Sequence, residues 1–532
     1  MRKLSSVLAL TVALAACQDL NVTNPNRPDR LRATTDPAAS EAFVSSSFRT
    51  WWQVGGHDDY PSWAFSTMAN EFTSGFADFG QLEPSAEPRS SWNNSPANAR
   101  DGVNRIPWFD LYATNSAVND AIKAIDGGQV IGDAARTTRT HAVGKFMQGI
   151  SHGYVGLYFD QGYIVDESVD LDTITVPALH PYPDVIAAAI GMIDSAIVIA
   201  QGNDFSLPAA PDGWFFTAMT RDQFVRLCNS FIARLMVYSA RTPAERAAVD
   251  WAAVMTRVDA GVQADFAPNG VIDVIWDDWK RLTSRVRNAA RPSDFGRPNY
   301  WLIGPADSTQ GFVNWVNTPV ANRVAFQMRT QDRRIQGAGG PTIAGTYAGY
   351  NNNNIFAASR GTYRFSHYYF RRYGSSTTWT GWTDSPLPAL TVSEMNLLKA
   401  EAYIRTNQAA LAVPLINLTR IANGQLPAVT VDGPPDLPGC VPRKLSGACG
   451  SLWDALRYEK GIEGMGVSGV VRYFDARGWQ MLPEGTMLHL PVPGDELVTI
   501  GVTNYTFGGI GGASAAPAPA PEACPVVLTR CP

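Results

Sequence analysis

The sequence is poor in charged residues, in histidine and in cysteine. Of its 532 residues 17% are charged, and 43 Lys and Arg against 48 Asp and Glu leave a net charge of −5. An ordinary soluble domain has about 25% charged residues, and the missing basic excess argues against nucleic acid as a partner. The cysteines contain no Cys-x-x-Cys pair, and no Walker phosphate-binding segment is present. We therefore expect no metal and no cofactor.

The first 17 residues have the pattern of a lipoprotein signal peptide. Arg2 and Lys3 precede the apolar run Val7–Ala16, which is too short to span a hydrocarbon core of about 30 Å. The run ends in Leu-Ala-Ala before Cys17, which resembles the bacterial lipobox. We expect residues 1–16 to be removed, Cys17 to carry the lipid anchor, and residues 17–37 to form a tether. An ordinary signal peptide that contains a cysteine is the alternative. No later stretch looks long and apolar enough to cross a membrane.

The remaining cysteines favour an oxidising compartment. Cys440 and Cys449 lie close together in a segment rich in Pro and Gly, and Cys524 and Cys531 lie in the C-terminal tail. Neighbouring and crossed disulfide pairs are both compatible with this spacing. Cys228 falls on an apolar helical stripe, so we expect it to be a buried free thiol.

Residues 38–507 are expected to form one domain with mostly helical periodicity. Apolar residues recur at 3.6-residue spacing, and Thr220-x-x-Gln223 has the pattern of a capping box. Two stretches, 53–107 and 265–385, are rich in Gly, Asn or Pro and in aromatics and should be loops. The tail 508–532 is rich in Ala and Pro and should be flexible and outside any core. Helices are expected near residues 38–52, 108–126, 137–159, 183–199, 221–238, 245–262, 391–405, 408–423 and 450–464.

Helix pairs with small residues at their contacts are similar to tetratricopeptide repeats, most clearly in residues 397–422. Several segments also resemble motifs of one family, the SusD/RagB family of outer-membrane nutrient-binding lipoproteins. These segments are Cys17–Asn26, Glu394–Tyr403, Pro414–Arg420, Leu456–Glu463, Val471–Gly478 and Leu490–Leu497. Their order is that of the family, although Lys460 stands where Arg is usual. On these matches the chain is identified as a divergent member.

The resemblance implies a mostly α fold, in which a tetratricopeptide-like helical-repeat scaffold carries large loop-rich insertions. It also implies a function without catalysis. A lipoprotein anchored in the outer membrane, at the cell surface, would bind a glycan or another nutrient such as a peptide. It would then deliver this nutrient to a TonB-dependent transporter of the SusC type. A lipid-anchored secreted hydrolase and a structural helical-repeat assembly protein are the alternatives.

Candidate ligand-binding residues lie in the two loop stretches. The apolar faces of a sugar stack on aromatic rings, while amide and guanidinium groups bond its hydroxyls. The candidates are Arg89, Trp92, Asn93 and Asn94 in the first stretch, and Tyr300, Trp301, Trp315, Trp379 and Trp382 in the second. Any single ring of this set could instead be a core residue.

Four other patterns are typical of enzymes or metal sites, and none has the context that the chemistry needs. Gly149-Ile-Ser-His-Gly153 matches the Gly-x-Ser-x-Gly elbow of serine hydrolases, yet it lies within an expected helix rather than after a strand. Paired carboxylates could act as in a glycosidase, but the sequence does not set their separation. The carboxylate pairs are Asp277 with Asp278 and Glu459 with Glu463. The candidate metal-binding pattern is His57-Asp58-Asp59. We expect no catalytic residue.

Overall fold

The computed structural model is mostly helical. It describes residues 35–54, 61–74, 83–169, 177–209, 213–268, 296–352, 366–372, 388–467 and 470–519. The longer helices are α3 (Pro37–Val54), α5 (Gly102–Asp126), α6 (Ala134–Tyr158), α7 (Tyr182–Ala200), α8 (Arg221–Tyr238), α14 (Val392–Arg405), α15 (Ala409–Ala422) and α16 (Leu452–Gly464). The shorter helices are α4 (Pro61–Met68), α9 (Pro243–Ala247), α10 (Trp251–Asp259), α12 (Tyr300–Ile303), α13 (Gly311–Asn317), α17 (Val471–Gly478) and α18 (Gly494–Thr499). Single 3₁₀ turns are η1 (Glu83–Ser85), η2 (Gly304–Ala306) and η3 (Val320–Asn322).

The strands are short and form two-stranded pieces. They are β1 (Phe72–Ser74), β2 (Gln161–Tyr163), β3 (Leu179–Pro181), β4 (Ser206–Leu207), β5 (Met219–Thr220), β6 (Gly296–Pro298), β7 (Ala348–Tyr350) and β8 (Tyr368–Phe370). All of them pair antiparallel, β1 with β6, β2 with β3, β4 with β5 and β7 with β8.

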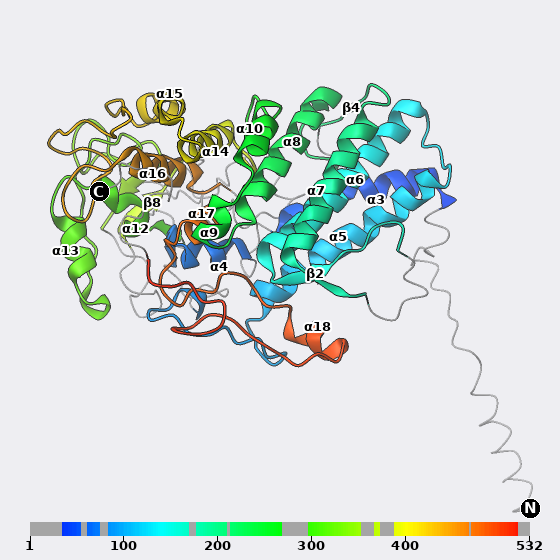
Figure 1. The fold of residues 1–532 in the computed structure, drawn as a ribbon, viewed down its shortest axis with the longest axis horizontal. Coiled ribbons are helices and arrows are strands. Elements are labelled where there is room, and N and C mark those ends of the chain that lie inside the picture. Colours follow the sequence, from blue (N-terminus) through cyan, green and yellow to red (C-terminus); the bar gives the residue numbers. More distant parts are fainter. Residues whose placement is uncertain are drawn as a thin grey trace, which may run out of the picture.

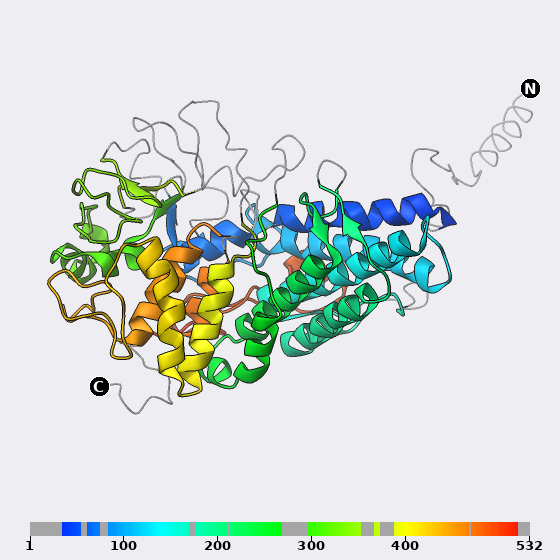
Figure 2. The ribbon, with the colours of Figure 1, turned by 90° about the horizontal axis from the view of Figure 1, so that it is seen from above.

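The scaffold is a row of helices that pack on one another largely in chain order. Helices α3, α5, α6, α7 and α8 form a bundle, and α10, α14, α15 and α16 continue the row toward the opposite end (Figures 1 and 2). Consecutive antiparallel helices of this kind are the architecture of tetratricopeptide-like repeats. The expected mostly α, repeat-like scaffold is confirmed.

Glycines allow the close packing of helix α6, which α3, α5, α7 and α8 all contact. A Cβ atom at Gly149 would lie 2.5 Å from Ile193 of α7, and one at Gly153 would lie 2.8 Å from Leu235 of α8. The Gly-x-Ser-x-Gly pattern is therefore a packing surface inside a continuous helix. Ser151 is itself 1% exposed, so the nucleophile-elbow reading fails on both secondary structure and access.

Helix α7 corrects one expectation about membrane segments. By length and composition it is long and apolar enough to cross a membrane. In the structure Val185, Ala189 and Ile193 are fully buried in the main core, where α7 packs along α6 and α8. We therefore describe α7 as a helix of the bundle.

Local capping explains the helix boundaries. The Thr220 side chain accepts from the Gln223 backbone N–H, and the Gln223 side chain accepts from the Thr220 backbone N–H, so the predicted capping box is present. The single helix expected over 245–262 is wrong, because the chain forms α9 and α10 instead. Asp250 caps α10 by accepting from the Ala253 N–H at 3.0 Å, which starts a new helix at that point.

The two loop-rich stretches are excursions from the scaffold that meet in space. The first lies between α3 and α5 and contains α4, while the second lies between α10 and α14 and contains α12 and α13. Strand β1 of the first pairs with β6 of the second, with Phe72 opposite Pro298. A second hydrophobic core forms there, and Trp63, Tyr300 and Ile462 are among its fully buried members.

The C-terminal tail is only partly as expected. Residues 508–519 fold back on residues 485–488, and Ala516 is buried in the main core, so the expectation that the tail lies outside any core is wrong for this part. Gly508 and Gly509 have φ of +82° and +83°, which glycine adopts without strain and which let the chain reverse. Residues 520–532, with Cys524 and Cys531, lie outside the described residues. Cys440 and Cys449 form a disulfide, and Cys228 is a buried free thiol.

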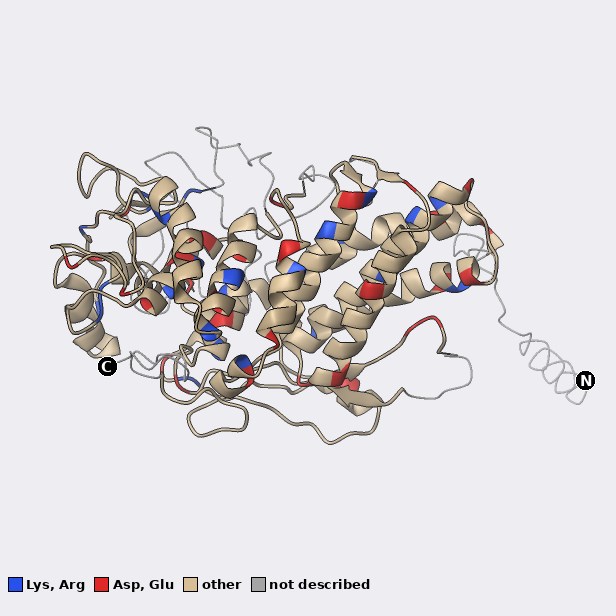
Figure 3. Cartoon of the chain, turned by 45° about the horizontal axis from the view of Figure 1, so that its top comes forward, with Lys and Arg blue, Asp and Glu red and all other residues tan. Residues whose placement is uncertain are grey.

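Charged residues of both signs are sparse and intermixed along the ribbon (Figure 3). Several of them are nevertheless buried, in what we call the Arg246 network. The Arg246 guanidinium donates to Glu401 of α14 at 2.7 Å and to Asp475 of α17 at 2.8 Å. Lys460 of α16 donates to Asp475 at 2.7 Å, and Arg405 donates to Glu401 at 2.8 Å. Three of the segments that resemble family motifs thus meet in one ion network.

Candidate ligand-binding site

A cavity of about 350 Å³ lies where the first loop stretch meets the C-terminal segment. It contains three of the sequence-predicted residues, Arg89, Trp92 and Asn93. The other lining residues are Met68, Glu83, Pro84, Ser90, Ser91, Asn98, Gly485, Thr486 and Met487. We call this the Trp92 cavity.

Arg89 holds the wall of the Trp92 cavity together. Its Nε donates to Thr486 Oγ1 at 3.0 Å, and its Nη1 donates to the Ala86 carbonyl at 2.8 Å and to the Ser85 carbonyl. Nη2 donates to the Met68 carbonyl at 3.3 Å. The side chain is 4% exposed, and this burial lowers the pKa of the guanidinium to about 10. Because protein acceptors take its donors, Arg89 fixes the loop around the cavity.

Trp92 lies between the cavity and the C-terminal segment. Its backbone N–H donates to the Phe507 carbonyl at 3.0 Å, and its own carbonyl accepts from the Thr506 hydroxyl. The ring is 5% exposed, and its Nε1–H has no acceptor among the described residues. A buried indole N–H usually finds a partner, so an unpaired donor in a residue that lines the cavity is uncommon.

The two neighbouring asparagines have different roles. Asn94 is buried, where its Nδ2 donates to the Val492 and Tyr505 carbonyls at 2.9 Å and its Oδ1 accepts from Asn104 at 2.8 Å. Asn93 is exposed, and its Oδ1 accepts only from the Ser95 N–H at 3.1 Å. Asn94 therefore anchors the loop, while the Asn93 amide faces solvent beside the cavity.

The predicted aromatics of the second stretch that the structure describes belong to the second hydrophobic core or pack against it. Tyr300 is fully buried, stacks on Phe326 at 4.3 Å between ring centroids and donates to its carbonyl, so it presents no surface to solvent. Trp315 is 6% exposed, whereas Trp301 is half-buried and packs edge-on against Trp315 at 6.1 Å. Trp379 and Trp382 lie outside the described residues.

The two sets are linked but do not line one cavity. Arg323 pairs with Glu87 of the first stretch at 3.7 Å, and its guanidinium lies 4.4 Å from the centre of the Trp315 ring. Neither Tyr300 nor Trp301 lines the Trp92 cavity. Of the candidates, the structure therefore brings Arg89, Trp92 and Asn93 together.

Sequence reasoning missed the other side of the Trp92 cavity, residues 485–487. The side chains of these residues do not by themselves suggest a binding site. Only the glycine indicates that the backbone is constrained there. Gly485 has φ of +82°, and a Cβ atom there would lie 3.0 Å from the Cβ of Arg89. A glycine between two helices was therefore the one available indication of a tight approach.

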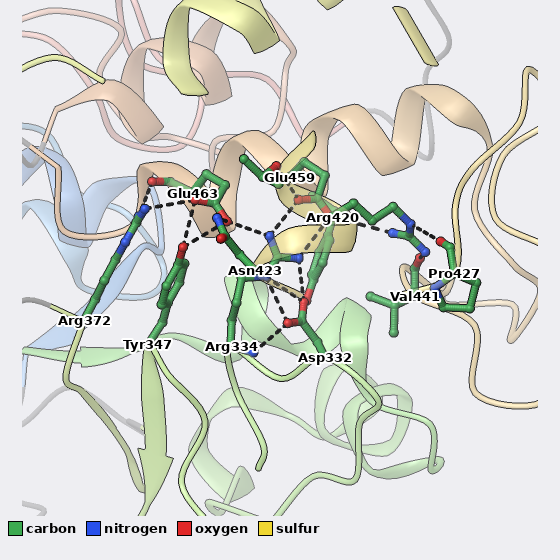
Figure 4. A network of polar contacts seen from close by, with 12 residues as sticks. Asp332, Arg334, Tyr347, Arg372, Arg420, Asn423, Pro427, Val441, Glu459 and Glu463 are labelled. Atoms are coloured by element: carbon green, nitrogen blue, oxygen red, sulfur yellow. Dashed lines mark hydrogen bonds and ion pairs between the residues drawn. The ribbon is translucent and has the colours of Figure 1, made fainter. Parts of the chain in front are cut away.

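The carboxylates Glu459 and Glu463 form no glycosidase pair, because both bind Arg334 (Figure 4). All five N–H groups of Arg334 are used, on Asp332, Glu459 and Glu463, in what we call the Arg334 network. Burial raises the pKa of Glu459, whereas the charges of Arg372 and Arg334 outweigh burial and lower the pKa of Glu463.

Other rival sites fare no better in the described part of the chain. There, no group of three or more His, Cys, Asp or Glu side chains is placed to hold a metal ion. Asp277, Asp278 and His57-Asp58-Asp59 lie outside the described residues. The spacing Gly464-x-Gly466-x-x-Gly469 is that of a dinucleotide-binding turn, but it follows helix α16 rather than a strand, so the required strand–turn–helix context is missing.

Comparison with known proteins identifies the fold. No protein-family model matches the sequence, and no curated protein sequence matches it. Solved structures do match. A SusD superfamily protein from Bacteroides vulgatus has a TM-score of 0.53 at 12% identity, over 84% of this chain and 89% of that one. A SusD-like protein from Bacteroides fragilis has a TM-score of 0.54 at 13% identity, over 88% and 96%.

A further match is a crystal structure with xylogluco-oligosaccharide, with a TM-score of 0.51 at 11% identity over 93% of this chain and 94% of that one. Each of these matches covers most of both chains, although few residues are identical. The protein therefore has the fold of the SusD superfamily, with few residues identical to those of these structures.

Proposed function

We propose that this protein is a non-catalytic lipoprotein of the cell surface that binds a glycan or another nutrient at the Trp92 cavity. The observation that carries the proposal is the cavity itself, which lies on the loop side of a SusD-like scaffold and contains three residues expected from sequence. Rigid scaffolds commonly present binding residues on loops. A structure of the same fold that contains xylogluco-oligosaccharide supports an oligosaccharide as the ligand.

The cavity suits a neutral, hydroxyl-rich ligand. Trp92 offers apolar ring surface, and Asn93 and Asn98 offer amides that can donate and accept. The Arg89 guanidinium already donates hydrogen bonds to the Ala86 and Met68 carbonyl oxygens. Sugar hydroxyls can pair with such groups without bringing a buried charge, which would be costly to desolvate.

Binding is tested by affinity electrophoresis against a panel of polysaccharides, followed by calorimetry with oligosaccharides of the glycan that retards the protein. We expect Trp92→Ala and Asn93→Ala to weaken binding about five- to tenfold, since one lost stacking or hydrogen-bonding contact costs about 1 kcal/mol. Asn203→Ala is the matched control, because Asn203 is an exposed amide on the helical bundle that donates to Thr138. Equal binding by all variants, or turnover of a bound polysaccharide, contradicts the proposal.

The anchor and the transporter are the second half of the proposal. Lipid on Cys17 would tether the protein to the outer membrane, and a TonB-dependent SusC-like barrel would receive the nutrient. We expect the protein to co-purify from outer membranes with such a barrel, and Cys17→Ser to release it from the membrane fraction. Retention of Cys17→Ser in that fraction, or absence of a barrel after mild extraction, contradicts this half.

A further inference from the structure

A second cavity, of about 280 Å³, lies on the helical bundle and shares no lining residue with the Trp92 cavity. Its lining comes from one face of α5, from the segment after β2 and from Glu496 of α18. The lining residues are Trp108, Phe109, Tyr112, Asn115, Ser116, Asn119, Asp120, Lys123, Tyr163, Val165, Asp166, Glu167, Val169, Pro177 and Glu496. We call it the α5 cavity.

One end of the α5 cavity is aromatic. Trp108, Tyr112 and Tyr163 contact one another, with ring centroids 4.9 to 5.6 Å apart. Their packing is fixed because the Tyr112 hydroxyl accepts from the Tyr163 N–H at 2.5 Å. Phe109 beside them is 39% exposed, and the Arg105 guanidinium lies 5.3 Å from the centre of its ring. Trp108 is itself 1% exposed, so the ring surface available at this end comes mainly from Phe109 and Tyr112.

The other lining side chains make the cavity acidic. Asp120, Asp166, Glu167 and Glu496 line it against one basic residue, Lys123. Glu167 is paired with Lys145 at 2.5 Å. Asp166 accepts from Ser168, and Glu496 accepts from the Tyr163 hydroxyl at 2.6 Å, but within the described ranges neither carboxylate has a basic partner. The cavity therefore holds negative charge that the protein does not neutralise.

A buried amide adds an independent sign of a ligand. Asn115 is 2% exposed, and its Nδ2 donates to the Val165 carbonyl at 2.6 Å. Its Oδ1 has no donor among the residues that the structure describes. Leaving a buried hydrogen-bond acceptor without a donor costs about 1–3 kcal/mol, and Asn115 is among the residues that line the cavity, so this cost is borne at the proposed site.

We propose that the α5 cavity binds a ligand that carries a protonated amine on an apolar or sugar-sized body. Aromatic rings attract cations through their π faces, and uncompensated carboxylates strengthen that attraction. The body would contact Phe109 and Tyr112, and the ammonium would lie toward Glu496 and Asp166. This site is separate from the proposed glycan site and could exist without it.

The test is calorimetry of the mature chain with benzyltrimethylammonium, and with benzyl alcohol as the neutral probe. We expect the cation to bind at least tenfold more tightly than the alcohol, and added salt to weaken it because the carboxylates are partly exposed. Glu496→Gln keeps an acceptor for Tyr163 and should weaken the cation about tenfold, and Asp166→Asn should act in the same direction. Lys123→Ala should strengthen binding, because it removes the opposing charge.

Two controls keep the result specific. Asp495 lies beside Glu496 on α18, but it is outside the cavity lining and pairs with Arg105 at 2.8 Å. Asp495→Asn should therefore leave binding of the cation unchanged. Trp92→Ala should also leave the cation unaffected, even if it abolishes glycan binding. The proposal is overturned if both probes bind equally, if neither binds, or if Glu496→Gln and Asp166→Asn bind like the parent. Unchanged thermal melting of each variant shows that its fold is intact.

Discussion

The two buried ion networks differ in what they join. The Arg246 network links α9, α14, α16 and α17, all of which are elements of the scaffold. The Arg334 network links α16 to the irregular segment around Asp332 and Tyr347, in the second loop stretch. One network therefore holds helices to helices, whereas the other attaches the loop side to the scaffold. In each network, ion pairing compensates the free-energy cost of burying charged side chains.

The largest expected effect comes from Arg334→Met. Removing one partner of a buried ion network leaves uncompensated charge and destabilises the folded protein by about 3–5 kcal/mol. In this variant three carboxylates lose their common partner. We expect the free energy of unfolding, measured with urea, to fall by that amount. Arg333→Met is the control, because the Arg333 side chain donates only to the Gln336 and Gly337 carbonyls and should cost less than about 1 kcal/mol. Similar losses in both variants would contradict a special role for the Arg334 network.

Glu71 is a buried carboxylate outside both networks. It accepts from the Gly466 N–H at 2.8 Å, and no ion pair with it is found in the described residues. Burial raises its pKa to about 7, although Arg472 acts in the opposite direction. Since the folded pKa lies above the unfolded one, its stabilising contribution is present at pH below about 4.5 and is lost as pH rises through 7. The loss is about 3 kcal/mol.

Glu71→Gln keeps the acceptor for Gly466 and removes the titration. We expect the variant to be more stable than the parent at pH 8 and to lose the parent's decline between pH 5 and 8. Urea unfolding at several pH values measures both curves. Parallel curves for the two proteins would show that Glu71 does not titrate in this range.

Glu401→Gln tests the Arg246 network. Burial alone would raise the pKa of Glu401, but the charges of Arg246, Arg405 and Lys460 hold it below its usual range. Its contribution is therefore present above pH 4.5 and lost as pH falls. We expect a loss of about 2 kcal/mol at pH 7, and a smaller difference between variant and parent at pH 3. A difference that does not shrink on acidification would contradict the pairing.

The smallest expected effect is that of Lys460→Arg, which introduces the residue usual in the motif that this segment resembles. Lys460 lies 2.7 Å from Asp475 and 3.6 Å from Glu401, so a guanidinium can bond both carboxylates. We expect the free energy of unfolding to change by less than about 1 kcal/mol. A loss above about 2 kcal/mol would show that the cavity around Lys460 is shaped for an ammonium.

Periodicity and capping predicted much of the scaffold but could not predict how the excursions meet. Strands β1 and β6 have three residues each, too few to leave a periodic pattern, and they pair across more than two hundred positions. Glu459 and Glu463 were visible as a pair, yet their partner Arg334 lies in an irregular segment 125 positions from Glu459. The segments that contain Glu401, Lys460 and Asp475 could be singled out from the sequence, because they resemble family motifs and lie on helices.

The candidate site was half predictable for a similar reason. Residue type alone singled out Trp92 and Asn93, since aromatic and amide groups in a loop suit a polar ligand. Residue type also selected Tyr300, whose ring is equally suited but is fully buried. Exposure depends on what packs above a side chain, and here that is Phe326, which no local pattern identifies.

The bond between Arg89 and Thr486 spans 397 positions of sequence, so the Trp92 cavity closes only after the C-terminal segment has been laid against the first loop stretch. Contacts between such distant segments form slowly. A chain interrupted before residue 485 would have only one wall of the cavity and would also lack Leu490, Val492 and Leu497 of the main core. A ligand that contacts both walls stabilises only those chains that contain residues 485–487.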